Sequence, residues 1–215
     1  MKKATLILED GSRFSGYSFG AEHPAIGEVV FNTAMTGYTE SLTDPSYAGQ
    51  IIVLTYPLVG NYGVPRKLFW ESEHIHPEAM IVSDYSEAFS HWNAEESLGN
   101  WLEREKVPGI TGIDTRALTK RLRESGVMMG KIEIEGADNT LSVIDYGSES
   151  YVERVSCREV IRYNEGKGKK VILVDCGVKA NIISPWWQSR SRPCPCCETR
   201  CESESQSEHS RRCFS

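Results

Sequence analysis

Two short runs of β-branched and aliphatic residues place the strongest constraint on how this chain can fold. Residues 29–31 and 51–54 have the length and composition of buried strands. The connection between them is long and rich in Thr and Ser, whereas connections in compact domains are ordinarily short. A polar connection of this length indicates a functional loop. Within it, Asp44-Pro45-Ser46-Tyr47 has Asp at the first position and Pro at the second, which predicts a type I turn.

The rest of the first 135 residues carries both strand and helix signals. Asp10-Gly11 separates two segments of strand character and predicts a hairpin. Asp114 is a good N-cap for a helix over residues 115–125, and Gly126 suits its C-terminal end. The remaining expected elements are strands near 5–8, 13–19, 27–31, 51–55, 79–82 and 127–135, and a helix over 97–106. This order predicts a sheet-dominated α+β domain over residues 1–135.

Beyond residue 135 the pattern changes. Residues 136–168 are expected to form a linker with a short helix at 156–162. Residues 171–175 are typical of a central parallel strand, and residues 178–183 would open a helix that Pro185 ends. From residue 184 to 215 there is no Ile, Val, Leu, Ala, Gly or Met. We expect this part to be a disordered tail, and hypothesise that it is an out-of-frame or misassembled translation.

Composition excludes several classes of function. The net charge of −6 argues against a nucleic-acid partner, because phosphate binding needs clustered Lys and Arg. No run approaches the roughly 20 apolar residues of a membrane span. The first residues lead directly into a strand, without the apolar region of a signal peptide, so we expect a cytoplasmic protein with no membrane partner. The odd number of cysteines, 7, argues against a disulfide framework.

A long segment of the chain resembles a known family. Residues 28–63, EVVFNTAMTGYTESLTDPSYAGQIIVLTYPLVGNYG, are similar to the N-terminal domain of the small, glutamine-using subunit of carbamoyl-phosphate synthetase. The similarity includes LILEDG at 6–11, GIDTRALT at 112–119 and DCGVKANI at 175–182, and extends over about residues 3 to 183. It implies a layered β/β/α domain at 1–135, a linker at 136–168, the truncated start of an α/β class I glutamine amidotransferase domain at 169–183, and an aberrant tail at 184–215.

The resemblance also implies a reaction. In this family the small subunit hydrolyses glutamine, and the large subunit uses the ammonia with bicarbonate and ATP, together with Mg²⁺, to make carbamoyl phosphate for arginine and pyrimidine synthesis. The expected partners are therefore the large subunit and L-glutamine, with no cofactor or metal in this chain. The family's catalytic Cys lies in a Gly-Ile-Cys-Leu-Gly-His-Gln motif that this sequence lacks, as it lacks the later His and Glu. We therefore expect no catalytic residue here. The residue that matches the family's glutamine site is Ser46, although a role in turn geometry alone is the alternative.

Three features resemble catalytic or metal sites and are interpreted as neither. His76-Pro77-Glu78 has the order of an acid–base pair, but we expect a surface turn, because the family places no catalysis in this domain. Cys176 follows a strand as a nucleophile would, yet a small buried side chain is the expectation. The cysteines of the tail, Cys194, Cys196, Cys197 and Cys201, are too closely spaced for a typical zinc site.

Two functions therefore remain open. The chain is either an incomplete glutaminase subunit of carbamoyl-phosphate synthetase or a non-catalytic module that docks on the large subunit. The cations of the helix at 115–125 are interpreted mainly as its solvated face, with a basic stripe for a partner as the alternative.

Overall fold

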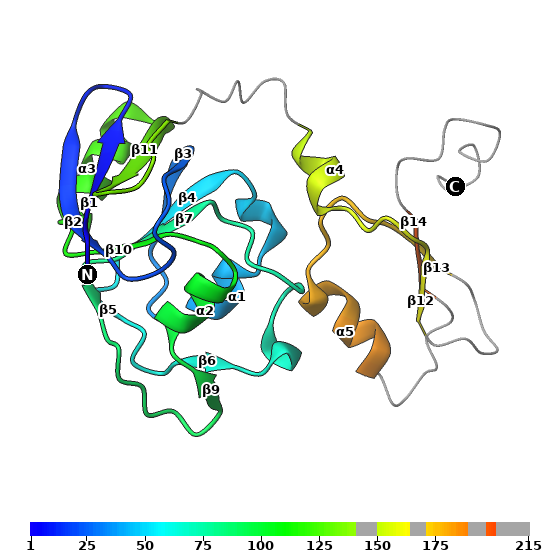
Figure 1. The fold of residues 1–215 in the computed structure, drawn as a ribbon. Coiled ribbons are helices and arrows are strands. Elements are labelled where there is room, and N and C mark those ends of the chain that lie inside the picture. Colours follow the sequence, from blue (N-terminus) through cyan, green and yellow to red (C-terminus); the bar gives the residue numbers. More distant parts are fainter. Residues whose placement is uncertain (141–149, 164–170, 189–196, 201–215) are drawn as a thin grey trace. The chain divides into compact units, whose positions relative to one another are not determined.

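The computed structural model describes residues 1–140, 150–163, 171–188 and 197–200. The chain divides into two compact units, Met1–Glu149 and Ser150–Ser215, whose elements are labelled in Figure 1. Helices and strands are mixed in the first unit, which confirms the α+β class predicted from the sequence. In the described ranges, no helix combines the length and apolar character needed to cross a membrane.

Seven strands of the first unit form one sheet that closes on itself. The strand order is β1-β11-β3-β4-β7-β10-β2. The pairs β3–β4, β4–β7 and β7–β10 are parallel, and the other printed pairs are antiparallel. The expected β layers are therefore parts of a single closed barrel. Its strands are β1 (Lys3–Leu8), β2 (Arg13–Ser18), β3 (Ala25–Asn32), β4 (Gln50–Leu54), β7 (Ala79–Ile81), β10 (Gly109–Thr111) and β11 (Met128–Ile134).

The hairpin between β1 and β2 forms where the Asp-Gly pair predicts it. The Ser12 N–H donates a hydrogen bond of 2.8 Å to Asp10 Oδ1, and Gly11 takes the left-handed conformation with φ 82°. The backbone N–H and the hydroxyl of Ser12 lower the pKa of Asp10 below its ordinary value, and the neighbouring Arg121 acts in the same direction. The turn therefore fixes the register that places Leu6 opposite Phe14.

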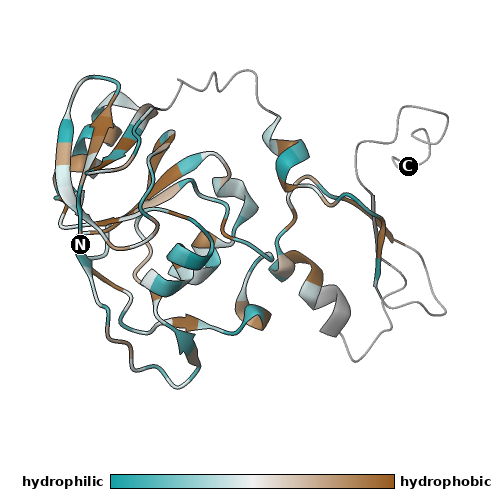
Figure 2. Ribbon diagram, in the orientation of Figure 1, coloured by the Kyte–Doolittle hydropathy of each residue, from teal (hydrophilic) through white to brown (hydrophobic). Residues whose placement is uncertain are grey.

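Two apolar clusters lie on opposite faces of β4. Ile51 and Val53 belong to a cluster that also contains Leu118 of helix α3 (Thr115–Ser125), whereas Ile52 and Leu54 belong to a second cluster. Because both faces are covered, residues 51–54 of this strand are apolar, as the sequence predicts, and only Gln50 at its start is polar. Figure 2 shows hydrophobic residues along the strands of this unit. The second cluster contains the largest fully buried side chain, Trp101.

Capping side chains mark the start of two helices of the first unit, α2 (Leu98–Arg104) and α3 (Thr115–Ser125). Ser97 Oγ accepts from the Asn100 N–H at the start of α2, and the Asp114 carboxylate accepts from the Ala117 N–H at the start of α3. Both caps confirm the predicted helix starts. The helices are α1 (Tyr38–Leu42), α2 (Leu98–Arg104), α3 (Thr115–Ser125) and the 3₁₀ turns η1 (Pro45–Tyr47) and η2 (Lys67–Phe69). Two short ribbons pair β5 (Leu58–Val59) with β8 (Asp84–Tyr85), and β6 (Val64–Pro65) with β9 (Ala94–Glu96).

The second unit differs from the expectation in two ways. The helix predicted at 156–162 is wrong, because Ser150 caps an earlier helix, residues 156–160 are irregular and Ile161 begins a strand. The break predicted at Pro185 is also wrong, since the helix continues to Gln188. A proline removes one intrahelical hydrogen bond, and here that loss does not end the helix. The elements are α4 (Tyr151–Val155), β12 (Ile161–Tyr163), β13 (Val171–Val174), α5 (Ala180–Gln188) and β14 (Cys197–Arg200).

The predicted strand of the second unit is present but lies at the edge of its sheet. The strand order is β12-β14-β13, so β13 pairs with β14 alone within the described residues. Ile172 and Val174 are 56% and 55% exposed, whereas a central parallel strand would be covered on both faces. The tail expected to be disordered contributes the strand β14.

Other predictions lie outside the described residues: the linker glycines at 166–168 and the tail cysteines other than Cys197.

Candidate functional site

Ser46 lies in the connection between β3 and β4, on the 3₁₀ turn η1. Its backbone N–H donates to Asp44 Oδ1 at 3.0 Å, and the Tyr47 N–H donates to the Asp44 carbonyl at 3.1 Å, which confirms the predicted turn. The residue is exposed. The connection is not a loop throughout, because α1 precedes the turn. Since β3 and β4 are parallel, the chain needs a long crossover here.

Thr43 joins α1 to this turn and is fully buried. Its hydroxyl donates to the Thr39 carbonyl at 2.8 Å and accepts from the Glu71 N–H at 2.9 Å. Its own carbonyl accepts from Ser72 Oγ at 2.6 Å. Thr43 therefore connects the segment that carries Ser46 to the distant segment that carries Glu71 and Ser72, and this was not anticipated from the sequence.

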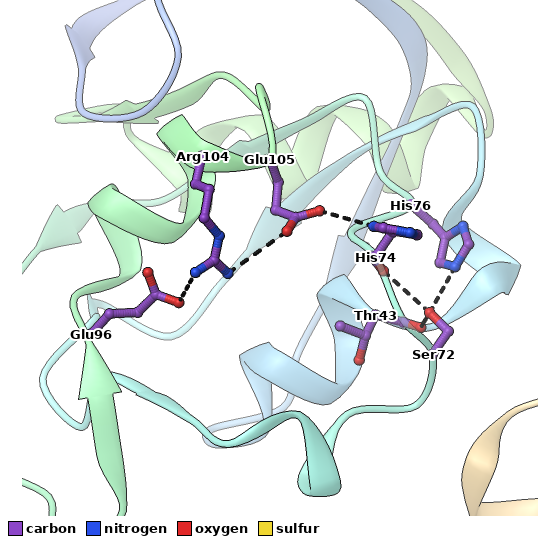
Figure 3. A network of polar contacts seen from close by, with 7 residues as sticks. All are labelled: Thr43, Ser72, His74, His76, Glu96, Arg104 and Glu105. Atoms are coloured by element: carbon purple, nitrogen blue, oxygen red, sulfur yellow. Dashed lines mark hydrogen bonds and ion pairs between the residues drawn. The ribbon is translucent and has the colours of Figure 1, made fainter.

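The second segment is itself held by a polar network, drawn in Figure 3. His76 Nε2 lies 2.8 Å from Ser72 Oγ, and the His76 N–H donates to the Leu42 carbonyl at 3.0 Å. The Ser72 hydroxyl lies within hydrogen-bond distance of two carbonyls, that of Thr43 at 2.6 Å and that of His74 at 3.1 Å. The His76 imidazole is the third polar group around this hydroxyl and supports the segment that contacts Thr43.

Charged side chains extend this network toward α2. His74 Nδ1 lies 3.3 Å from Glu105 Oε2, and the Arg104 guanidinium lies 2.8 Å from Glu96 and 3.7 Å from Glu105. His74 and Arg104 are largely exposed, so we attribute little stability to each pair. The arrangement orients the end of α2 relative to the segment that supports the Ser46 turn (Figure 3).

Helix α1 begins at Gly37 without a capping side chain of its own. The Tyr62 hydroxyl replaces that cap by accepting from the Gly37 and Tyr38 N–H groups at 2.8 and 3.0 Å. The Tyr38 and Tyr62 rings stack with centroids 4.2 Å apart, and burial raises the pKa of both phenols, which therefore stay protonated. Asn32 adds a link from β3, donating to Ser41 Oγ and the Tyr47 hydroxyl.

A small hollow lies beside the start of α1, next to the residues that follow β3. It is lined by Ala34, Met35, Thr36, Tyr38, Ser41, Leu54, Tyr56, Leu58, Val59 and Tyr62. Ser46 is not among these residues, so the hollow and the predicted glutamine contact are separate places on the crossover. We place the candidate site at Ser46, because its exposed hydroxyl is available to a ligand and its backbone is fixed.

The structure corrects two further expectations. The His76-Pro77-Glu78 segment is not a simple surface turn: Pro77 is buried and His76 is half-buried, because the segment leads into the central strand β7. Cys176 is exposed rather than buried, since it follows β13 at the edge of its sheet. Within the described residues, no group of three or more His, Cys, Asp or Glu side chains is arranged to hold a metal ion.

Asp175 organises the strand–helix corner of the second unit. Its carboxylate accepts from the Gly177 and Val178 N–H groups at 2.8 Å each and from the Cys157 N–H at 2.7 Å. Burial raises the pKa of Asp175, but the three backbone donors outweigh this and bring the pKa below its ordinary value. The corner is a structural turn that joins β13 to the segment after α4.

The link at Thr43 can be tested by Thr43→Val, which keeps the shape and removes the hydroxyl. We expect the free energy of unfolding to fall by about 1–3 kcal/mol, because the buried Glu71 N–H loses its acceptor. Urea unfolding of the variant measures the loss. Thr33→Val, at an exposed position of the same crossover, is the matched control and should change stability by less than about 0.5 kcal/mol. Equal effects of the two substitutions would show that Thr43 is not a specific link.

Comparison with known proteins identifies the first unit. A family model described as carbamoyl-phosphate synthase small chain, CPSase domain, matches residues 6–132. The chain belongs to the carbamoyl-phosphate synthase small chain family. The matched residues include the whole barrel except the ends of β1 and β11, and they include the Ser46 turn and Thr43.

Curated relatives extend the similarity over most of the chain. The carbamoyl phosphate synthase arginine-specific small chain of Eremothecium gossypii is 46% identical over 195 residues, which cover 85% of this chain and 49% of the relative. The human mitochondrial carbamoyl-phosphate synthase [ammonia] is 44% identical over 84% of this chain and 12% of its own length. The multifunctional protein CAD of Squalus acanthias is 46% identical over 84% of this chain and 8% of its own. The chain thus spans about half the length of the small-chain relative and far less of the larger ones.

Proposed function

We propose that this chain is part of the small subunit of a glutamine-dependent carbamoyl-phosphate synthetase and docks on the large subunit. In the complete enzyme the small subunit hydrolyses glutamine, and the large subunit uses the ammonia with bicarbonate, ATP and Mg²⁺. The observation that carries the proposal is the family match over the barrel of the first unit. The name of the Eremothecium relative, a small chain, supports a large-chain partner, and the long multifunctional relatives are consistent with one. A cytoplasmic location is part of the proposal.

We further propose that Ser46 contacts glutamine in the complete small subunit. Its hydroxyl is exposed, whereas the backbone that carries it is fixed by Asp44 and, through Thr43, by the Ser72 segment. An exposed hydroxyl on a rigid turn can donate or accept one hydrogen bond with little loss of conformational entropy on binding. The rest of the glutamine site would come from the amidotransferase domain.

The alternative function is a docking module without catalysis, and one observation favours it for this chain. The described histidines, residues 23, 74, 76 and 91, all lie in the first unit, whereas the described cysteines, Cys157, Cys176 and Cys197, lie in the second. Within the described residues, neither unit contains the Cys–His pair that glutamine hydrolysis by a thiolate requires. The two functions are compatible if the chain docks and catalysis needs residues that it lacks.

One experiment separates these functions. The purified chain is mixed with immobilised large chain, taken from the enzyme of the Eremothecium relative, and glutamine hydrolysis is measured in parallel. We expect retention on the large chain and no glutamate release above background. Release of glutamate by the chain alone would show that it carries a complete glutaminase. Absence of retention would overturn the docking function.

The role of Ser46 is tested in a chimaera in which the first unit of this chain replaces the matching part of the Eremothecium small chain. We expect Ser46→Ala to raise the KM for glutamine about three- to tenfold, the loss of one hydrogen bond, with a smaller change in kcat. Ser15→Ala, at an exposed position of β2, should leave both constants unchanged. An unchanged KM in Ser46→Ala would assign Ser46 to turn geometry alone.

A further inference from the structure

The outward face of α3 carries three positive charges in a row. Leu118 and Leu122 pack into the first apolar cluster, and Arg116, Lys120 and Arg123 are exposed at positions i, i+4 and i+7. Residues with this spacing lie on one face of a helix, so the three cations form a stripe about 10 Å long. We name these three residues the α3 stripe.

The stripe has no counter-ion within the described residues. Six Lys and Arg side chains of the first unit do form ion pairs with described residues: Lys2, Arg13, Arg66, Arg104, Arg121 and Lys131. Lys3, Lys67 and Lys106 also form none with them, but they are scattered, whereas the stripe residues share one helix face. On α3 itself, Arg121 pairs with Asp10 of the hairpin, whereas the stripe residues pair with no described carboxylate. This is notable in a chain of net charge −6, in which carboxylates outnumber cations.

Two of the three stripe residues, Arg116 and Lys120, are placed unfavourably for the stability of their helix. Arg116 and Lys120 are like charges one turn apart, an arrangement that destabilises a helix. Arg116 also lies in the first turn of α3, where the helix dipole favours a carboxylate; the capping Asp114 precedes this turn, and the turn itself contains no acidic side chain. These effects are unfavourable at Arg116 and Lys120, whereas Arg123 in the last turn suits the dipole, and an anionic surface placed against the stripe would relieve the repulsion between the cations.

We propose that the α3 stripe docks against an acidic surface of the large chain of carbamoyl-phosphate synthase. The inference rests on the proposed docking function and names the face that performs it. A protein surface fits better than a nucleic acid, because three cations on an otherwise acidic chain do not form the extended basic patch that binds phosphates. Carboxylates on the partner would pair with the stripe and speed the encounter of the two chains.

The test measures binding of the full chain to immobilised large chain of the Eremothecium enzyme by biolayer interferometry. We compare wild type with the triple variant R116E/K120E/R123E. The matched control K3E/K106E/R158E makes the same change in net charge at exposed cations that are scattered over the chain. We expect the stripe variant to bind about ten- to a hundredfold more weakly, mainly through a slower association rate, and the control to bind within about threefold of wild type. Raising the salt concentration should weaken wild type but not the stripe variant.

A neutral variant supplies a readout that does not depend on binding. R116Q/K120Q/R123Q should unfold at the same or a slightly higher temperature than wild type, while its affinity for the large chain falls. If wild type binds and the stripe variant binds equally well, this inference is overturned and the docking function stands. If wild type does not bind the large chain, both the docking function and this inference fail. An equal loss of affinity in the scattered control would assign the effect to net charge. Binding of wild type to a duplex DNA of 20 base pairs that is tighter than its binding to the large chain would identify a nucleic-acid partner. Either result overturns the proposal for the α3 stripe.

Discussion

Replacing Trp101 with alanine is expected to lower the free energy of unfolding of the first unit by about 3–5 kcal/mol. The side chain is fully buried in the second apolar cluster and packs on Trp70, with ring centroids 4.7 Å apart. The truncation leaves a cavity between α2 and the strands, in addition to the lost burial of the indole. A loss of this size is a large share of the total stability of a domain, which is about 5–15 kcal/mol. Urea unfolding followed by circular dichroism measures it.

The chain provides its own control for this substitution. Trp92 is 85% exposed, so Trp92→Ala should change stability by no more than about 0.5 kcal/mol. Trp101→Phe is a second comparison, because the Trp101 Nε1 atom is buried without a hydrogen-bond partner. The phenyl ring removes that N–H and keeps most of the packing, so we expect a loss well below that of Trp101→Ala. Similar losses for Trp92→Ala and Trp101→Ala would contradict the assignment of the core.

Limited proteolysis is expected to remove the second unit and leave the first. Among residues 150–163 and 171–184 of the second unit, whose burial the structure describes, only Asp175 is buried, and none belongs to either apolar cluster. Segments with little burial open readily and are cleaved first. Mass spectrometry should therefore find a resistant product that begins at Met1 and ends between residues 135 and 168, with full-length chain lost at least about tenfold faster than this product.

Two proteases of different specificity make this result independent of cleavage sites. Trypsin cuts after Arg and Lys, whereas thermolysin cuts before apolar residues, and both should give the same boundary. A full-length chain that resists both enzymes would mean that the second unit has a core of its own. The exposed apolar side chains of β13, Ile172 and Val174, would then need another explanation.

Local chemistry accounts for what the sequence predicts well. The Asp-Gly hairpin, the cap at Asp114 and the apolar residues 51–54 of β4 each depend on neighbouring residues, so each can be recognised in a short stretch. Helix α1 could not be anticipated in this way. It begins at a glycine, and its first N–H groups are satisfied by the hydroxyl of Tyr62, which lies 24 and 25 residues further along the chain.

At the candidate site, too, local contacts are predicted from the sequence and distant ones are not. The Ser46 turn is predicted because Asp44 and Pro45 adjoin it. The support from Ser72 is not predicted, since it depends on a contact with the Thr43 carbonyl across 29 positions. The exposure of Cys176 was missed for the opposite reason: an apolar strand is ordinarily covered by neighbouring strands, and β13 has only one within the described residues.

The pairing of β1 with β11 has a consequence for synthesis on the ribosome. Ala4 lies opposite Ile134, so the strand made first cannot gain its second neighbour until more than 130 residues have been translated. At about 5–20 residues per second this takes on the order of ten seconds, during which one edge of the nascent hairpin stays open. Contacts so distant along the chain also make folding slow after release. A chain that stopped before this strand would never complete the ring of hydrogen bonds.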